Sequence, residues 1–177
     1  PPYLHYDLWL GPATELPYHP AWVPFAWRNW WAFGGGALAD FGCHYMDLPH
    51  WALGLTHPEK VEVLDGPAVH PDSTPPWLIV RYSHPARGDK PPVRVTWYHG
   101  GKHPDFLKPE QYDQWKSGVL FLGTKGQLIA NYGAHTLWPE EDFKDFKRPE
   151  PFIPNSIGHH QEWIEAIKNQ RPTTCNL

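Results

Sequence analysis

The sequence is poor in sulfur and in long apolar runs. Its 177 residues include two cysteines, Cys43 and Cys175. Two cysteines cannot build a disulfide framework, so the sequence indicates neither a cytoplasmic nor a periplasmic location. No apolar run approaches the ~18 residues of a membrane-spanning helix. The 15 basic residues are outnumbered by 19 acidic ones and form no cluster. We therefore expect neither a membrane nor a nucleic acid as a partner.

Aromatic residues and prolines are abundant instead. The chain has 11 Trp, 8 Tyr, 8 Phe and 22 Pro, so large rings supply the surface that a loop-rich fold can bury. Residues 1–33 follow neither a two-residue nor a 3.6-residue period, which predicts an irregular aromatic arm. Residues 34–177 are expected to form an α+β body. We expect a single domain over 1–177 that is a fragment of a longer, two-domain protein, because neither end has a capped element.

Residues 37–53 predict a helix. Apolar residues recur there at steps of three and four, which indicates one buried face. These residues are Leu38, Phe41, Tyr45, Leu48 and Ala52. Pro49 lacks a backbone N–H and is expected to kink or restart this helix.

The period then changes to that of β-strands. Strands are expected over residues 60–64, 77–82 and 93–98, and as a hairpin over 118–122 and 127–130. A second helix is expected over 157–169, with Ser156 as its N-cap. This order predicts an α+β fold, an open antiparallel or mixed sheet with helices on one face.

One stripe of the first helix is polar. At about 100° per residue, Asp40, His44 and Asp47 share this stripe, and residues that favour burial lie on both sides of it. Two interpretations stay open. The carboxylate and imidazole could lie in a cleft and transfer a proton, or Asp40 could orient a structural histidine. A metal site is disfavoured, because no familiar spacing of metal ligands is present.

Further candidates for substrate binding lie elsewhere in the chain. Arg28 and Trp31 belong to an aromatic run in which a cation and flat rings suit a hydroxylated or anionic ligand. The alternative for Arg28 is a cation–π brace for the arm. Lys102 could line the same cleft or be a solvated loop cation, and His159 stands at the start of the second helix.

A glycine pattern before the first helix has the form of a dinucleotide fingerprint. Gly34-x-Gly36-x-x-Ala39 is preceded by an aromatic segment and not by a β-branched strand, so its context does not fit a phosphate-binding turn. We therefore expect no cofactor-binding residues in this chain.

Several motifs resemble the Gfo/Idh/MocA oxidoreductases, the glucose–fructose oxidoreductase and inositol dehydrogenase family. They are Tyr6-Asp7-Leu8-Trp9-Leu10-Gly11-Pro12-Ala13, Trp27-Arg28-x-Trp30-Trp31-x-Phe33-Gly34 and the run from Gly36 to Asp47. The segments Ser156–Trp163 and Pro172–Asn176 continue the likeness.

The resemblance implies the C-terminal domain of a two-domain enzyme. The missing Rossmann domain would bind NAD or NADP and carry the family's catalytic lysine, so this chain alone is expected to bind no cofactor and to be inactive. Asp40 and His44 correspond to the family's helix residues that face the nicotinamide and a sugar or cyclitol carbon. The open sheet often mediates oligomerisation in this family. A homo-oligomer contact is also expected from the strands' apolar side chains, Trp77, Ile79, Tyr82, Val95 and Trp97.

Two alternatives to the oxidoreductase stay open. The first is a stand-alone, cofactor-free domain that binds carbohydrate or assembles with a partner. The second is a glycoside hydrolase or lyase that uses Asp40 and His44 without net redox chemistry.

Overall fold

A computed structural model describes residues 2–174. The chain divides into two compact units, Pro1–Glu140 and Glu141–Leu177. The single domain expected over residues 1–177 stays a prediction. Within the described residues, no helix combines the length and the apolar character needed to cross a membrane.

The aromatic arm contains two short helices and a cluster of rings. They are α1 (Tyr6–Leu10) and the 3-10 helix η1 (Ala26–Asn29). Trp9 is central to the cluster, since its ring centroid lies 5.6 Å from that of Tyr6 and 5.1 Å from that of Phe33. Such ring pairs stabilise a segment that has little helical or sheet hydrogen bonding of its own.

The end of the arm is bonded to the loop that precedes the second strand. Residues 29–31 and 72–74 run antiparallel, and we call them the clasp. The amides of Trp31 and Thr74 donate across it, at 3.0 Å and 2.9 Å. Because Thr74 is buried, this attachment is shielded from water and fixes the arm beside the helix that follows.

Helix α2 (Gly36–Leu53) begins directly after the clasp. Gly36 has φ +70°, and a Cβ there would lie 2.6 Å from Thr74 Oγ1, so glycine allows the close approach. The helix continues through the buried Pro49 and does not restart there, so the kink stays a prediction. The His50 ring lies 2.7 Å from the Met46 carbonyl in this last stretch.

The expected buried face of α2 is only partly covered. Leu38, Tyr45 and Leu48 are half-buried, whereas Phe41 is 50% exposed. The prediction that Phe41 is buried is therefore wrong. Its ring lies against that of His44 on the same helix. The helical period shows that Phe41 is on the same face as Leu38 and Tyr45, but it does not show how much of that face other elements cover.

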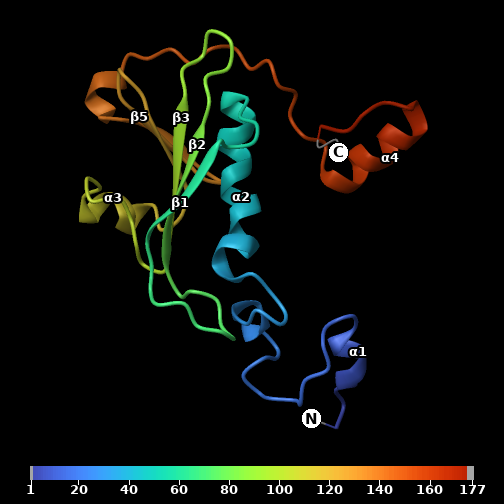
Figure 1. The fold of residues 1–177 in the computed structure, drawn as a ribbon. Coiled ribbons are helices and arrows are strands. Elements are labelled where there is room, and N and C mark those ends of the chain that lie inside the picture. The colour runs from blue at the N-terminus through green and yellow to red at the C-terminus, as the bar shows by residue number, and fades with distance from the viewer. Residues whose placement is uncertain (1, 175–177) are drawn as a thin grey trace. The chain divides into compact units, whose positions relative to one another are not determined.

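Three strands form an antiparallel sheet with the second in the middle. They are β1 (Lys60–Asp65), β2 (Leu78–His84) and β3 (Val93–His99). The buried His84 ring lies 5.2 Å from the His50 ring, which places the C-terminal half of α2 beside β2 (Figure 1).

The exposed apolar side chains of this sheet lie on the edge strand β1. Val61, Val63 and Leu64 are 56%, 66% and 41% exposed. The sequence analysis expected a different set of side chains to form an exposed apolar surface. These side chains are half-buried in the structure: Trp77, Ile79, Tyr82, Val95 and Trp97.

A second antiparallel sheet has the order β4–β5–β6. These strands are β4 (Val119–Leu122), β5 (Gln127–Ala130) and β6 (His135–Trp138). The β4–β5 hairpin confirms the prediction, whereas β6 was not predicted. A core of Trp115, Ile129 and Trp138 packs on it. The short helix α3 (Pro109–Gln114), also unpredicted, ends at Trp115 and so delivers this ring to the core.

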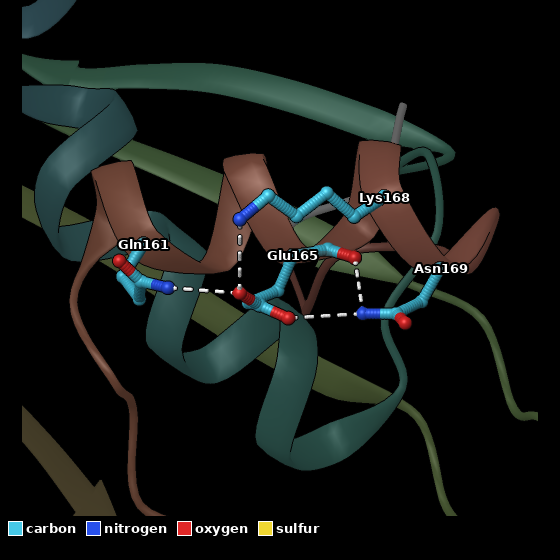
Figure 2. Close-up of polar contacts among 4 residues, drawn as sticks. All are labelled: Gln161, Glu165, Lys168 and Asn169. Carbon is cyan, nitrogen blue, oxygen red and sulfur yellow. Dashed lines mark hydrogen bonds and ion pairs between the residues drawn. The ribbon is translucent and has the colours of Figure 1, made fainter.

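The second unit contains α4 (His159–Asn169), which begins two residues later than expected. Its N-cap is Gly158 and not Ser156, whose hydroxyl instead accepts a hydrogen bond from the Gly158 amide. Figure 2 shows Glu165 at the centre of a polar network. Its carboxylate accepts hydrogen bonds from Gln161 at 2.9 Å and Asn169 at 3.0 Å, and lies 3.9 Å from the Lys168 ammonium.

The described strands and helices confirm the α+β class and its antiparallel pairing. The strands form two three-stranded sheets where the sequence suggested one. The small core around Trp115 packs on the β4–β5–β6 sheet, and α2 contacts strand β4 of that sheet. Helix α2 is therefore the element on which both sheets and the arm converge.

Candidate functional site

The polar stripe of α2 receives a cation from the arm. Arg28 Nε in η1 lies 2.9 Å from Asp40 Oδ2, and the two side chains are 21% and 35% exposed. The Arg28 guanidinium carbon lies 4.0 Å from the Phe25 ring centroid and 4.9 Å from that of Trp27. Its Nη1 also donates to the Phe25 carbonyl. Arg28 is thus both a cation–π brace and the ionic partner of Asp40.

The arm chain is folded tightly behind this ion pair. A Cβ on Gly34 would lie 2.7 Å from the Arg28 Cα, so the backbone of Gly34 rests on that of Arg28. The Arg28 side chain therefore extends from a tightly packed backbone, and its guanidinium contacts both the aromatic rings and Asp40. A carboxylate held by such a cation stays available to accept further hydrogen bonds from hydroxyl groups.

His44, one turn after Asp40, is exposed and contacts two aromatic rings. Its ring centroid is 5.9 Å from that of Phe41 and 6.1 Å from that of Tyr132. The polar partner of Asp40 in the structure is Arg28, so the imidazole of His44 is open to solvent and to a ligand. An imidazole in this position can exchange a proton with a bound hydroxyl.

Tyr132 comes from the turn between β5 and β6 and was not predicted. It is 74% exposed, and its ring also lies 5.6 Å from that of Tyr45 in α2. Desolvation raises the pKa of its phenol, and nearby Tyr45, Cys43 and Asp47 add to the rise. Tyr132 is therefore a neutral hydroxyl beside His44 at physiological pH. No local pattern links this turn to α2, so only the tertiary structure finds it.

The other predicted site residues lie in different surroundings. Asp47 is exposed on α2 near Tyr132. Trp31 belongs to the clasp, and its indole donates to the His70 carbonyl at 3.3 Å. The Lys102 ammonium lies 4.0 Å over the Trp77 ring. His159 is exposed and belongs to the second unit. The first unit thus brings together Arg28, Asp40 and His44, while Trp31 and Lys102 have contacts of their own.

A comparison with models of protein families identifies the family of this chain. Residues 1–89 match the family model described as "Oxidoreductase family, C-terminal alpha/beta domain", GFO_IDH_MocA_C2. The chain belongs to the Gfo/Idh/MocA oxidoreductase family. A search of curated proteins gave no significant match. The matched residues contain the arm, α2, β1 and β2, and therefore Arg28, Asp40 and His44.

The glycines of this Gfo/Idh/MocA domain do not fit a dinucleotide phosphate. The space beside Gly34 is filled by the Arg28 backbone and that beside Gly36 by Thr74. The segment before them is a bridge and a turn instead of a buried strand, so the turn that would cradle a pyrophosphate is missing. Among the described residues, no group of three His, Cys, Asp or Glu side chains could hold a metal ion.

An apolar groove lies further along α2. It is lined by Leu48, Ala52 and Leu53 of α2 and by residues of the second sheet and its turn: Phe121, Leu128, Ala130, Asn131 and His135. The Asp40–His44 stripe is not part of its lining, so this groove and the candidate site are separate features of the Gfo/Idh/MocA domain.

Proposed function

We propose that the chain is the substrate-binding and catalytic half of an NAD(P)-dependent oxidoreductase that acts on a sugar, a cyclitol or a related polyol. Its membership in the Gfo/Idh/MocA family supports oxidoreductase chemistry. The observation that carries the proposal is the exposed imidazole of His44, one turn from the Arg28-bound carboxylate of Asp40.

In this proposal, His44 takes the proton from the substrate hydroxyl that is oxidised. Asp40, held in place by Arg28, accepts a hydrogen bond from a neighbouring hydroxyl and so orients the ring or chain of the substrate. A nicotinamide bound by a separate Rossmann domain would supply the hydride acceptor. We do not expect the turn at Gly34 and Gly36 to hold the pyrophosphate of that cofactor, because Arg28 and Thr74 fill the space beside these two glycines.

The test uses the complete gene product with NAD+ or NADP+ and a panel of sugars, glycosides, cyclitols and polyols. Formation of NAD(P)H is followed for the wild type and for His44→Ala. We expect turnover to fall by about 10²–10⁴-fold, the usual contribution of general acid–base catalysis. His57→Ala, an exposed histidine in the loop before β1, is the control and should keep normal turnover.

Three results would contradict the proposal. Near-normal turnover in a folded His44→Ala variant would remove His44 from the chemistry. Release of a free sugar without formation of NAD(P)H would indicate a hydrolase or lyase. Binding of sugar by the complete protein without any turnover on the panel would favour a carbohydrate-binding domain.

A further inference from the structure

His44 is the middle ring of three that come from two separate parts of the chain. Phe41 precedes it by three residues on α2, so the two side chains are neighbours on one helix face. Tyr132 approaches from the β5–β6 turn. The ring planes of Phe41 and Tyr132 are inclined to that of His44 by 51° and 83°. All three side chains are exposed, with 50% for Phe41 and 74% for Tyr132.

The turn that carries Tyr132 is well fixed. The side-chain oxygen of Asn131 accepts hydrogen bonds from the amides of Gly133 and Ala134, both at 2.9 Å. The Asn131 amide donates to the Ala134 carbonyl, also at 2.9 Å. Tyr132 is therefore held in place by its own turn, although most of its ring is open to solvent.

Helix α2 also contacts the Tyr132 ring, through Tyr45. The Tyr45 ring lies 5.6 Å from that of Tyr132, and the Tyr45 hydroxyl donates to Ser117 Oγ at 2.7 Å. Exposed apolar side chains that gather in one patch mark binding surfaces, whereas singly scattered ones do not. Phe41 and Tyr132 both contact the exposed imidazole of His44, which indicates a ligand that is itself partly apolar.

A cyclic sugar or cyclitol has this character. The C–H bonds of one ring face form an apolar surface that packs on aromatic rings, while the hydroxyls at the ring edge remain free to hydrogen bond. An open-chain polyol has no such face. We propose that Phe41 and Tyr132 form a platform that binds the apolar face of a six-membered carbohydrate ring, so that a ring hydroxyl reaches His44 and cyclic substrates are preferred over open-chain ones. The inference rests on the proposed function, because it assigns the substrate class of the same site.

The test compares glucose and myo-inositol with sorbitol as probes of the complete gene product. For the cyclic probes, Tyr132→Ala and Phe41→Ala should raise KM by about tenfold, since one lost aromatic contact corresponds to roughly that factor. Sorbitol should change by less than about threefold. Tyr132→Phe keeps the ring and should stay close to wild type. Phe106→Ala, which removes another exposed aromatic side chain, is the matched control.

Saturation-transfer NMR with the same three probes separates this inference from the proposed function, because it needs no turnover. If no probe is oxidised but the cyclic probes bind and lose their signal in Tyr132→Ala, the platform holds and the oxidoreductase proposal fails. If the cyclic probes do not bind, or bind Tyr132→Ala as well as wild type, the platform is wrong. Tyr132 is on an exposed turn, so its variant gives a result even if Phe41→Ala does not fold.

Discussion

Arg28 of the arm and Asp40 of α2 form an ion pair of 2.9 Å, with the guanidinium also stacked on Phe25 and Trp27. The pair joins an irregular segment to the helix that carries the candidate catalytic histidine. Its energy depends on charge attraction and on ring stacking together, which distinguishes it from an ordinary surface ion pair.

A double-mutant cycle measures this coupling. Arg28→Gln and Asp40→Asn, alone and together, should give a coupling energy of about 0.5–1 kcal/mol in urea unfolding, the range for partly exposed pairs. Arg28→Lys should not restore it, because an ammonium loses the planar stacking. The pair Lys60–Glu62, whose cation is 65% exposed, is the control and should couple more weakly. Strict additivity at Arg28 and Asp40 would contradict the prediction.

The buried His84 should make the stability of the first unit depend on pH. Burial lowers its pKa, the charge of His50 adds to this, the Thr56 backbone opposes it, and Arg87 and His57 lower it further. The unfolded chain therefore takes up a proton at the ordinary histidine pKa of about 6.5, while folded His84 stays neutral until the pH is lower.

The free energy of unfolding should consequently fall as the pH drops from about 7.5 towards 5. His84→Leu should flatten this part of the curve, whatever it does to stability at neutral pH. His5→Leu, an exposed position, should leave the slope unchanged. Urea unfolding across this pH range is the measurement, and an unaltered slope in His84→Leu would show that another group titrates.

Two adjacent glycines after β3 should respond differently to substitution. Gly100 and Gly101 have φ values of +68° and +78°, which alanine adopts only with strain. A Cβ on Gly100 would lie 2.2 Å from the Pro76 carbonyl oxygen, whereas one on Gly101 would meet nothing within 4 Å. Gly101→Ala should cost about 1 kcal/mol from the backbone alone, and Gly100→Ala at least about 2 kcal/mol more. Equal unfolding midpoints for the two variants would be evidence against this close contact.

The chain by itself should not bind NADH with useful affinity. The spaces beside Gly34 and Gly36 are already filled by Arg28 and Thr74, so the turn that has the form of a dinucleotide fingerprint has no room for a pyrophosphate. Titration of NADH into the purified chain, followed by nicotinamide fluorescence, should show no saturation. A dissociation constant in the low micromolar range would overturn this expectation.

Self-association is expected through the edge strand β1. Val61 and Val63 are more than half exposed, and exposed apolar side chains on a sheet edge favour contact with a second chain. Val63→Lys should lower the mass measured by light scattering at high concentration. Val69→Lys, at a loop position that is 90% exposed, is the control and should not. A monomeric mass for the unmodified chain would rule the contact out.

The regular elements were predictable where one period extended over several residues. The helix around Asp40, the three strands of the first sheet and the β4–β5 hairpin all follow from such patterns. Strand β6 (His135–Trp138) is as short as β4 and β5, but it lacks the Gly123-Thr124-Lys125-Gly126 turn signal that made their hairpin predictable. Helix α3 has six residues and is hidden in a long connection, although Pro109 at its first position is a known start signal.

The site was predictable only as far as one helix stripe could show. Asp40 and His44 follow from helical spacing, and Arg28 from its aromatic neighbours, yet nothing local shows that Arg28 reaches Asp40. Tyr132 is 88 residues from His44 by the printed numbering, and its approach depends on how the second sheet packs on α2. Contacts of that kind are decided by tertiary packing and leave no periodic trace in the sequence.

The clasp decides where this domain can be cut for expression. A recombinant version that starts after Phe33 would remove the carbonyl of Asn29, which accepts from both the amide and the hydroxyl of the buried Thr74. The two donors of Thr74 would then lose their protein partner at the point where Gly36 starts α2, a loss that costs about 1–3 kcal/mol for each donor that stays buried. The arm is therefore part of the smallest unit that should fold properly. Its removal should destabilise the start of the helix that carries His44.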